Sequence, residues 1–238
     1  MHSPLTEPEK PAWGEPPAAG ATARAGKIHV WRAAVPAALT PALEAVVSEP
    51  ELRYARQMTA DTSMRQFTAA QAALRSALSR YLGDSPAAIE FRRGEHGKPF
   101  LVERHASDIQ FNLTHSHDLA IAAVTAGNEI GVDLEKVRAR PATERLAKRF
   151  YATEERAALD EAPVELKERL FFRLWTRKES HLKATGTGLS VTLRDIDTLA
   201  PHGDWWYHEF EPAPDYVATI AGTGQRPTFN YFDLTLPT

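Results

Sequence analysis

Two carboxylates follow directly on an apolar, strand-like stretch in Gly131-Val-Asp-Leu-Glu135. In an extended chain alternate side chains point to the same face, so Asp133 and Glu135 share one face of the predicted strand. Two residues span about 6.6 Å along a strand, which lets both acids converge on one cation. An oxygen-only pair suits Mg²⁺, which often shares its coordination shell with substrate phosphates. The spacing taken alone favours the alternative, two solvated acids on an exposed strand face.

A second charged group lies on a predicted helix, Trp175-Thr-Arg-Lys-Glu-Ser-His-Leu-Lys183. Glu179 and Lys183 are four residues apart and therefore share a helix face. An ordinary surface ion pair explains that spacing. The functional alternative makes Glu179 a third metal carboxylate and uses Lys178 and Lys183 as point-charge donors to phosphate oxygens. The helix pattern by itself does not separate these two interpretations.

Polar side chains also gather at the end of another predicted strand, in Asn112-Leu-Thr-His-Ser116. The turn expected from His115 to Asp118 offers hydroxyl and imidazole donors for a phosphate, and local turn capping is the alternative. A serine–histidine hydrolase is disfavoured, because neighbouring strand residues face opposite sides and no Gly-x-Ser-x-Gly elbow occurs. The histidines show no HExxH spacing, which disfavours a zinc protease.

The stretch Arg149-Phe-Tyr-Ala-Thr-Glu-Glu-Arg156 predicts the start of a helix. Thr153 is the expected N-cap, and Glu154 and Glu155 would stabilise the positive end of the helix dipole. Just before it, residues 136–149 hold six basic side chains against one acid. Such a run is either a solvated face or a surface that attracts an acidic partner.

The elements that would position these residues follow from hydrophobic periodicity. Apolar spacing predicts helices over 64–81, ended by Gly83, and over 166–184, ended by Thr-Gly-Thr-Gly. Alternating and β-branched runs predict strands over 27–31, 109–114, 119–125, 206–210 and 216–221. Each half thus contains a helix followed by a strand pair, a weak sign of internal repetition. We therefore expect two α+β halves with a ligand cleft between them.

Composition excludes several classes of protein. The 238 residues carry 28 Lys and Arg against 31 Asp and Glu, a formal charge of −3, which argues against a nucleic-acid binder. The chain has no cysteine, so disulfides, thiol catalysis and Cys-ligated metals are excluded. The sequence shows neither a membrane span nor a secretory signal, so we expect a cytoplasmic protein with no membrane contact. The Pro- and Ala-rich residues 1–26 predict a flexible tail.

Five segments, taken together and in order, resemble the Sfp-type 4′-phosphopantetheinyl transferases. They are Gly97-Lys-Pro99 and the segments at 112–116, 131–135, 149–155 and 175–189, spread over residues 28–222. The resemblance implies that family's pseudo-duplicated fold, two similar α+β lobes with the active cleft between them. We expect the N-terminal lobe at 27–129 and the C-terminal lobe at 130–238. Both lobes would belong to one chain, so a monomer is expected.

The resemblance also implies a reaction, the transfer of the 4′-phosphopantetheine arm of coenzyme A to a serine of an apo acyl or peptidyl carrier protein. The other product is 3′,5′-ADP. The length favours the type that serves secondary metabolite biosynthesis. Position by position, the resemblance implies Mg²⁺ ligation by Asp133, Glu135 and Glu179, and phosphate contacts by Lys178 and Lys183. It also implies coenzyme A phosphate contacts by Thr114 and His115, a place near the adenine for Lys98, and a metal or base role for Glu155. The family uses basic residues of the N-terminal lobe for the 3′-phosphate, and Arg53, Arg56 and Arg65 lie in the corresponding region. The chemistry of the reaction makes Glu179, acting directly or through a metal-bound water, the expected acceptor of the serine proton.

Two positions depart from the family pattern. Thr114 stands where serine is usual and keeps the hydroxyl. His181 stands where a small or apolar residue is common, so if it faces the core it needs a hydrogen-bond partner. Two other functions compete with the transferase: a Mg²⁺-dependent hydrolase of coenzyme A-like pyrophosphates, and a coenzyme A-binding module without turnover.

Overall fold

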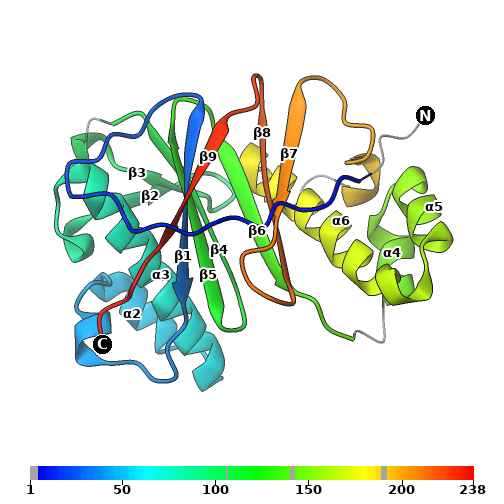
Figure 1. The fold of residues 1–238 in the computed structure, drawn as a ribbon. Coiled ribbons are helices and arrows are strands. Elements are labelled where there is room, and N and C mark those ends of the chain that lie inside the picture. The colour runs from blue at the N-terminus through cyan, green and yellow to red at the C-terminus, as the bar shows by residue number, and fades with distance from the viewer. Residues whose placement is uncertain (1–4, 106, 140–142, 189–191) are drawn as a thin grey trace. The chain divides into compact units, whose positions relative to one another are not determined.

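The structure is a computed structural model that describes residues 5–105, 107–139, 143–188 and 192–238. It divides into two compact units: unit 1 comprises the chain up to Pro11 together with Glu129–Arg226, and unit 2 comprises Ala12–Asn128 and Pro227–Thr238. Helices and strands occur in both units, which confirms the predicted α+β class (Figure 1). Within the described ranges, no helix is long and apolar enough to cross a membrane.

Unit 2 is built on a four-stranded sheet with one long helix against it. The strands are β1 (Lys27–Ala34), β4 (Ile109–Ser116), β5 (Leu119–Ala126) and β9 (Thr228–Asp233), in the order β4-β5-β1-β9. Helix α3 (Asp61–Leu82) packs on this sheet through buried small residues such as Ala69, Ala73 and Ala77. The helix predicted over 64–81 is confirmed, and it ends at Gly83, whose φ of 74° favours glycine.

Shorter elements complete unit 2: α1 (Pro41–Glu44), α2 (Glu49–Ala55), and the hairpin strands β2 (Phe91–Arg93) and β3 (Pro99–Leu101). The predicted strands over 109–114 and 119–125 correspond to β4 and β5. Strand β4 continues through Ser116, however, so the turn is shorter than expected and consists of His117 and Asp118. The side chains of Thr114 and His115 therefore lie on a strand and not in a turn.

Unit 1 contains a three-stranded antiparallel sheet covered by a second long helix. Its strands are β6 (Ile130–Lys136), β7 (Trp205–Phe210) and β8 (Tyr216–Thr223), in the order β6-β8-β7. Helix α6 (Val164–Thr185) packs on β6 and β8, preceded by α4 (Thr143–Phe150) and α5 (Thr153–Glu161) (Figure 1). The predicted N-cap at Thr153 is wrong by one residue, because Ala152 caps α5 and Thr153 begins it.

The two units repeat one connectivity. In unit 2 the order along the chain is β1, α3 and the hairpin β4–β5; in unit 1 it is β6, α6 and the hairpin β7–β8. In each unit the second hairpin strand lies in the sheet between its hairpin partner and the first strand, antiparallel to both. Both long helices have 22 residues and end at a left-handed glycine. The predicted similarity of the two halves is thus confirmed at the level of topology.

The N-terminal segment requires a correction. The sequence predicts that residues 5–26 are flexible, but Glu9 and Gly14 of this segment make backbone hydrogen bonds at an edge of the three-stranded and of the four-stranded sheet. Glu9 donates to the carbonyl of Glu209 and accepts from Glu211 beside β7, with N–O distances of 3.0 and 2.8 Å. Gly14 bonds in the same way to Tyr231 and Asp233 along β9, at 3.0 and 2.9 Å. Residues 1–4 of the predicted tail lie outside the described residues.

Side chains hold the same segment in place. The ring of Trp13 meets that of Tyr231 edge-on, with centroids 5.3 Å apart, and the Arg32 guanidinium lies 4.3 Å from the Trp13 ring centroid. Sheet edges carry unpaired backbone groups, so the N-terminal segment covers positions where other chains would otherwise pair.

The C-terminal end also differs from the prediction. Residues 227–238 were predicted to belong to the C-terminal lobe, but they belong to unit 2 through β9.

Removing the chain up to Gly14 should therefore destabilise the protein and promote self-association. Four backbone hydrogen bonds to the sheet edges are lost, each worth about 1 kcal/mol net, partly offset by the entropy of freeing the segment. We expect a fall in Tm of about 3–8 °C and larger species in light scattering after size exclusion. An unchanged Tm together with an unchanged molar mass would contradict the edge-covering role.

Candidate active site

Strand β6 presents its functional face to helix α6 at very short range. A Cβ atom on Gly131 would lie 2.0 Å from the Ser180 carbonyl oxygen and 2.4 Å from the Ala184 nitrogen, so only glycine fits there. Because side chains alternate along a strand, Asp133 and Glu135 lie on the same face as Gly131. Asp133 is 7% exposed, whereas Glu135, nearer the strand end, is half-buried. The close contact at Gly131 thus brings the acids of β6 to the side chains of α6.

Helix α6 contributes Glu179 and Lys183, which lie one turn apart, to the contact with β6. The Lys183 ammonium donates to Asp133 Oδ1 at 2.7 Å and to the Val132 carbonyl at 3.1 Å. Burial raises the pKa of Glu179, the negative charge of Asp133 raises it further, and Lys183 opposes both effects. The three residues Asp133, Glu179 and Lys183 are called the β6–α6 cluster below. The cluster places two acids, balanced by one lysine, in a partly buried setting.

The β6–α6 cluster has the donor chemistry of a magnesium site, but it does not form the predicted three-carboxylate group. In the described part of the chain, no three His, Asp or Glu side chains lie close enough together to hold a metal ion. Glu135 is two residues further along β6, about 6.6 Å from Asp133 along the backbone, and Lys183 occupies one oxygen of Asp133. Asp133 and Glu179 remain a suitable pair, since Mg²⁺ often binds through one or two carboxylates and substrate phosphates.

Lys178 and Glu155 meet, but away from the β6–α6 cluster and in a way that corrects both predicted roles. Both residues are 0% exposed, and the Lys178 ammonium lies 2.7 Å from Glu155 Oε2. Lys178 also donates to the carbonyl of Leu193 at 2.8 Å and to that of Ile196. A buried ammonium with three acceptors has no donor left for a phosphate. The predicted phosphate contact of Lys178 is therefore not supported.

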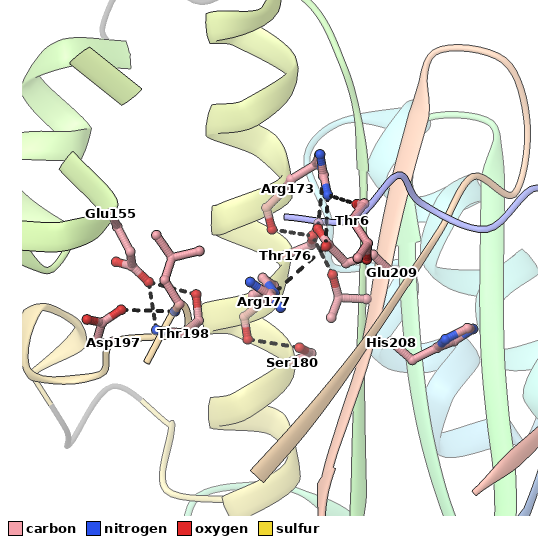
Figure 2. A network of polar contacts seen from close by, with 12 residues as sticks. Thr6, Glu155, Arg173, Thr176, Arg177, Ser180, Asp197, Thr198, His208 and Glu209 are labelled. Atoms are coloured by element: carbon pink, nitrogen blue, oxygen red, sulfur yellow. Dashed lines mark hydrogen bonds and ion pairs between the residues drawn. The ribbon is translucent and has the colours of Figure 1, made fainter. Parts of the chain in front are cut away.

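The Glu155 carboxylate is equally occupied. Oε2 accepts from the Ala152 backbone nitrogen at 2.9 Å, and Oε1 accepts from the backbone nitrogen and hydroxyl of Thr198 at 3.0 and 2.7 Å. Figure 2 shows Glu155 directed from α5 toward Thr198. With every oxygen engaged inside the protein, Glu155 does not fit the predicted metal or base role. Sequence reasoning missed Thr198, because nothing in the sequence near Thr198 links it to a residue 43 positions away.

His181 has a hydrogen-bond partner, as predicted for a histidine that faces the core. Its Nδ1 lies 2.8 Å from the Tyr207 hydroxyl, and its ring stacks on Trp205 with centroids 3.8 Å apart. Burial, followed by the charge of Lys178, lowers the pKa of His181 to about 4. The imidazole is therefore neutral near pH 7 and packs as an aromatic ring.

The remaining predicted residues lie in unit 2. Thr114 is buried and His115 exposed, as expected for neighbours on β4. Lys98 lies in the β2–β3 connection, with its ammonium 5.7 Å from the Phe100 ring centroid. Arg65, on α3, donates to the Pro36 carbonyl at 2.8 Å. A cavity of about 1010 Å³ also lies in unit 2, and its lining includes Tyr54, Phe67, Arg75, Phe91 and Pro99.

Comparisons with known proteins bear on both units. A family model described as 4'-phosphopantetheinyl transferase superfamily matches residues 129–221, and one described as 4'-phosphopantetheinyl transferase, N-terminal, matches residues 30–127. The chain is 37% identical over 219 residues to the 4'-phosphopantetheinyl transferase HetI of Nostoc sp., an alignment that covers 87% of this chain and 92% of that protein. The chain belongs to the 4′-phosphopantetheinyl transferase family.

Other similarities of this transferase are shorter. It is 34% identical over 131 residues to the 4'-phosphopantetheinyl transferase Sfp of Bacillus subtilis, which covers 55% of this chain and 56% of Sfp. A solved holo-(acyl-carrier-protein) synthase of Bacillus anthracis, in complex with CoA (3',5'-ADP), matches 33% of this chain and 73% of its own at 26% identity. Its TM-score of 0.29 is too low to relate the folds.

The two family models cover all of the predicted site residues but not the whole chain. The match at 129–221 contains the β6–α6 cluster and the Lys178–Glu155 pair, and the match at 30–127 contains Arg65, Lys98, Thr114 and His115. The N-terminal segment before residue 30 and strand β9 fall outside both matches. The five-motif resemblance is thus confirmed, and it covers the part of the chain that carries the predicted chemistry.

Replacing Gly131 with alanine should damage this transferase through packing alone. The new methyl group would overlap the Ser180 carbonyl, so β6 and α6 must separate, at a cost of about 1–3 kcal/mol or more. We expect Tm to fall by about 3–10 °C and the transfer rate to fall with it. Gly14→Ala is the matched control, because its methyl would meet only the Tyr231 carbonyl, at 3.7 Å. Equal behaviour of the two variants would refute the packing argument.

Proposed function

We propose that this transferase moves the 4′-phosphopantetheine arm of coenzyme A to a serine of an apo carrier protein by Mg²⁺-dependent transfer at the β6–α6 cluster. The observation that carries the proposal is the contact of Lys183 with Asp133 beside Glu179. Phosphoryl-type transfer needs positioned opposite charge more than covalent help from the protein. A cluster of two acids and one lysine, fixed between a strand and a helix, supplies both signs of charge in one place.

The reaction balances without any further reactant. The carrier serine oxygen forms a bond to the phosphorus that bears the pantetheine arm, and the bond from that phosphorus to the bridging oxygen breaks. The bridging oxygen leaves with 3′,5′-ADP, and the serine proton passes to a carboxylate. Glu179 is the proposed acceptor, since it lies on the same helix face as Lys183 and is only partly buried.

The residues of the cluster share the remaining tasks in this proposal, and Glu179 would act both as proton acceptor and as metal ligand. Asp133 and Glu179 would hold Mg²⁺, which when bound neutralises charge on the pyrophosphate. Lys183 holds Asp133 in place, and its partly exposed ammonium would contact the phosphate oxygens of the departing group. Glu135 is kept as a weaker candidate ligand at the strand end.

Unit 2 would contribute recognition of coenzyme A. Lys98, Thr114, His115 and Arg65 keep their proposed contacts to the adenine and phosphate groups. The cavity of unit 2 supports this part of the proposal, because it mixes aromatic side chains with arginine and includes Pro99, next to Lys98. Such a lining suits a purine base.

Two outcomes would redirect the proposal. Cleavage of coenzyme A without modification of a carrier would favour a hydrolase of pyrophosphates. Binding of coenzyme A with neither cleavage nor transfer would favour a non-catalytic binding module.

The decisive test is intact-protein mass spectrometry of an apo fatty-acid carrier and an apo peptidyl carrier incubated with coenzyme A. We expect a gain of one phosphopantetheine group with Mg²⁺ and none with a chelator. Asp133→Asn should lower the rate by at least about 100-fold, because one ligand charge and the Lys183 partner are lost. Asp108→Asn, at an exposed acid in unit 2, is the control. Full turnover by Asp133→Asn would remove the β6–α6 cluster from the mechanism.

Carrier docking is proposed to use the basic residues 136–149, because carrier domains are commonly acidic. Arg138 and Arg145 are both exposed, whereas Arg140 lies outside the described residues. Reversing both charges, to Glu, should raise the KM for the carrier about tenfold and weaken its salt dependence, with the KM for coenzyme A unchanged. Arg24→Glu, at an exposed arginine in unit 2, is the matched control. An unchanged salt dependence would contradict docking on this stretch.

A further inference from the structure

The Lys178–Glu155 pair is buried inside unit 1 and takes no part in the chemistry proposed above. Both side chains are fully buried, and every polar atom of the pair is engaged. A buried ion pair is a weak source of net stability, because desolvating two charges consumes most of the energy that their attraction returns. Stability alone therefore does not explain why this ion pair lies in the core of a transferase.

The pair connects three elements at one point. Lys178 comes from the middle of α6, Glu155 from the first turn of α5, and the carbonyl and hydroxyl partners from residues 193–198, around the short helix η4 (Leu193–Asp195). Any rotation or sliding of α6 would break several of these bonds together. The pair thus fixes helix α6 about its own axis and along it.

Helix geometry carries this constraint directly to the β6–α6 cluster. Lys178 and Glu179 are adjacent, so their side chains leave the helix about 100° apart. With Lys178 fixed toward α5 and η4, Glu179 and Lys183 must turn toward β6. The other faces of α6 are held as well: Thr176 shares a hydroxyl contact of 2.9 Å with Thr219 on β8, and Arg173 bonds to Glu209 on β7 (Figure 2).

We infer that Lys178 and Glu155 are positioning residues, which set the orientation of Glu179 and Lys183, and that Lys178 does not touch coenzyme A. This inference rests on the proposed function of the β6–α6 cluster. It assigns the two lysines of the helix motif different tasks. Lys183 acts at the reaction centre, and Lys178 holds the helix that carries it.

The test compares Lys178→Met, Glu155→Gln and the double variant with the wild type. Lys178→Met leaves a buried carboxylate without its cation, so its Tm should fall by far more than that of the uncharged double variant. For the double variant we expect kcat to fall at least tenfold, the KM for coenzyme A to stay within twofold, and Mg²⁺ binding measured by calorimetry without coenzyme A to weaken at least threefold. Lys167→Met, at a half-buried lysine of α6 whose ammonium donates to the Asp160 carbonyl and not to Glu155, should match the wild type in kcat, in the KM for coenzyme A and in Mg²⁺ binding.

Two results would overturn the inference. A tenfold rise in the KM for coenzyme A at unchanged kcat would show that Lys178 contacts the substrate. A double variant that regains both Tm and full kcat would show that the pair is merely structural. If Lys178→Met does not fold, the double variant is judged by the same criteria. Absence of transfer by the wild type would refute the proposed function instead, while the Tm and Mg²⁺ comparisons would still test the positioning role.

Discussion

The close approach of β6 and α6 at Gly131 is the constraint on which the rest of unit 1 depends. A strand and a helix normally stay apart by the thickness of their side chains, but here the backbone of α6 occupies the space of a missing Cβ. At this range Lys183, on α6, donates both to Asp133 and to the backbone carbonyl of Val132. The absence of one side chain therefore determines where the charged ones meet.

Such proximity has an electrostatic consequence. Asp133 and Glu179 repel each other in a setting that water only partly screens, and one lysine balances two acids. This repulsion would move α6 away from β6, and other contacts of α6 oppose that movement. Arg173 and Arg177 approach Glu209 on β7, and Lys178 pairs with Glu155. The helix is thus held by ion pairs on the faces that point away from the cluster.

Much of this architecture was predictable from the sequence, for identifiable reasons. Helices α3 and α6 show apolar periodicity and end at glycines, and β4, β5, β7 and β8 show strand patterns, so the repeated topology could be anticipated. The N-terminal segment could not, because the argument for flexibility considered only the burial of side chains. Its partners are backbone groups at sheet edges, which no local sequence pattern reveals. The burial of Lys178 was partly readable, since residues five apart on a helix point about 140° apart, which places Lys178 and Lys183 on different faces of α6.

The duplicated fold places a strand–helix junction in each unit, and the two junctions carry different side chains. In unit 2, the strand equivalent to β6 is β1, and the helix equivalent to α6 is α3. There, His29 and Trp31 meet Tyr81, with His29 Nδ1 2.7 Å and Trp31 Nε1 3.1 Å from its hydroxyl. Burial, followed by the charge of Lys27, lowers the pKa of His29, so this group is neutral near pH 7. Its polar atoms satisfy one another and leave no charge to be balanced. The same strand–helix junction in unit 1 instead brings together two acids and one lysine, so the two junctions differ in the charge of their side chains and not in their fold.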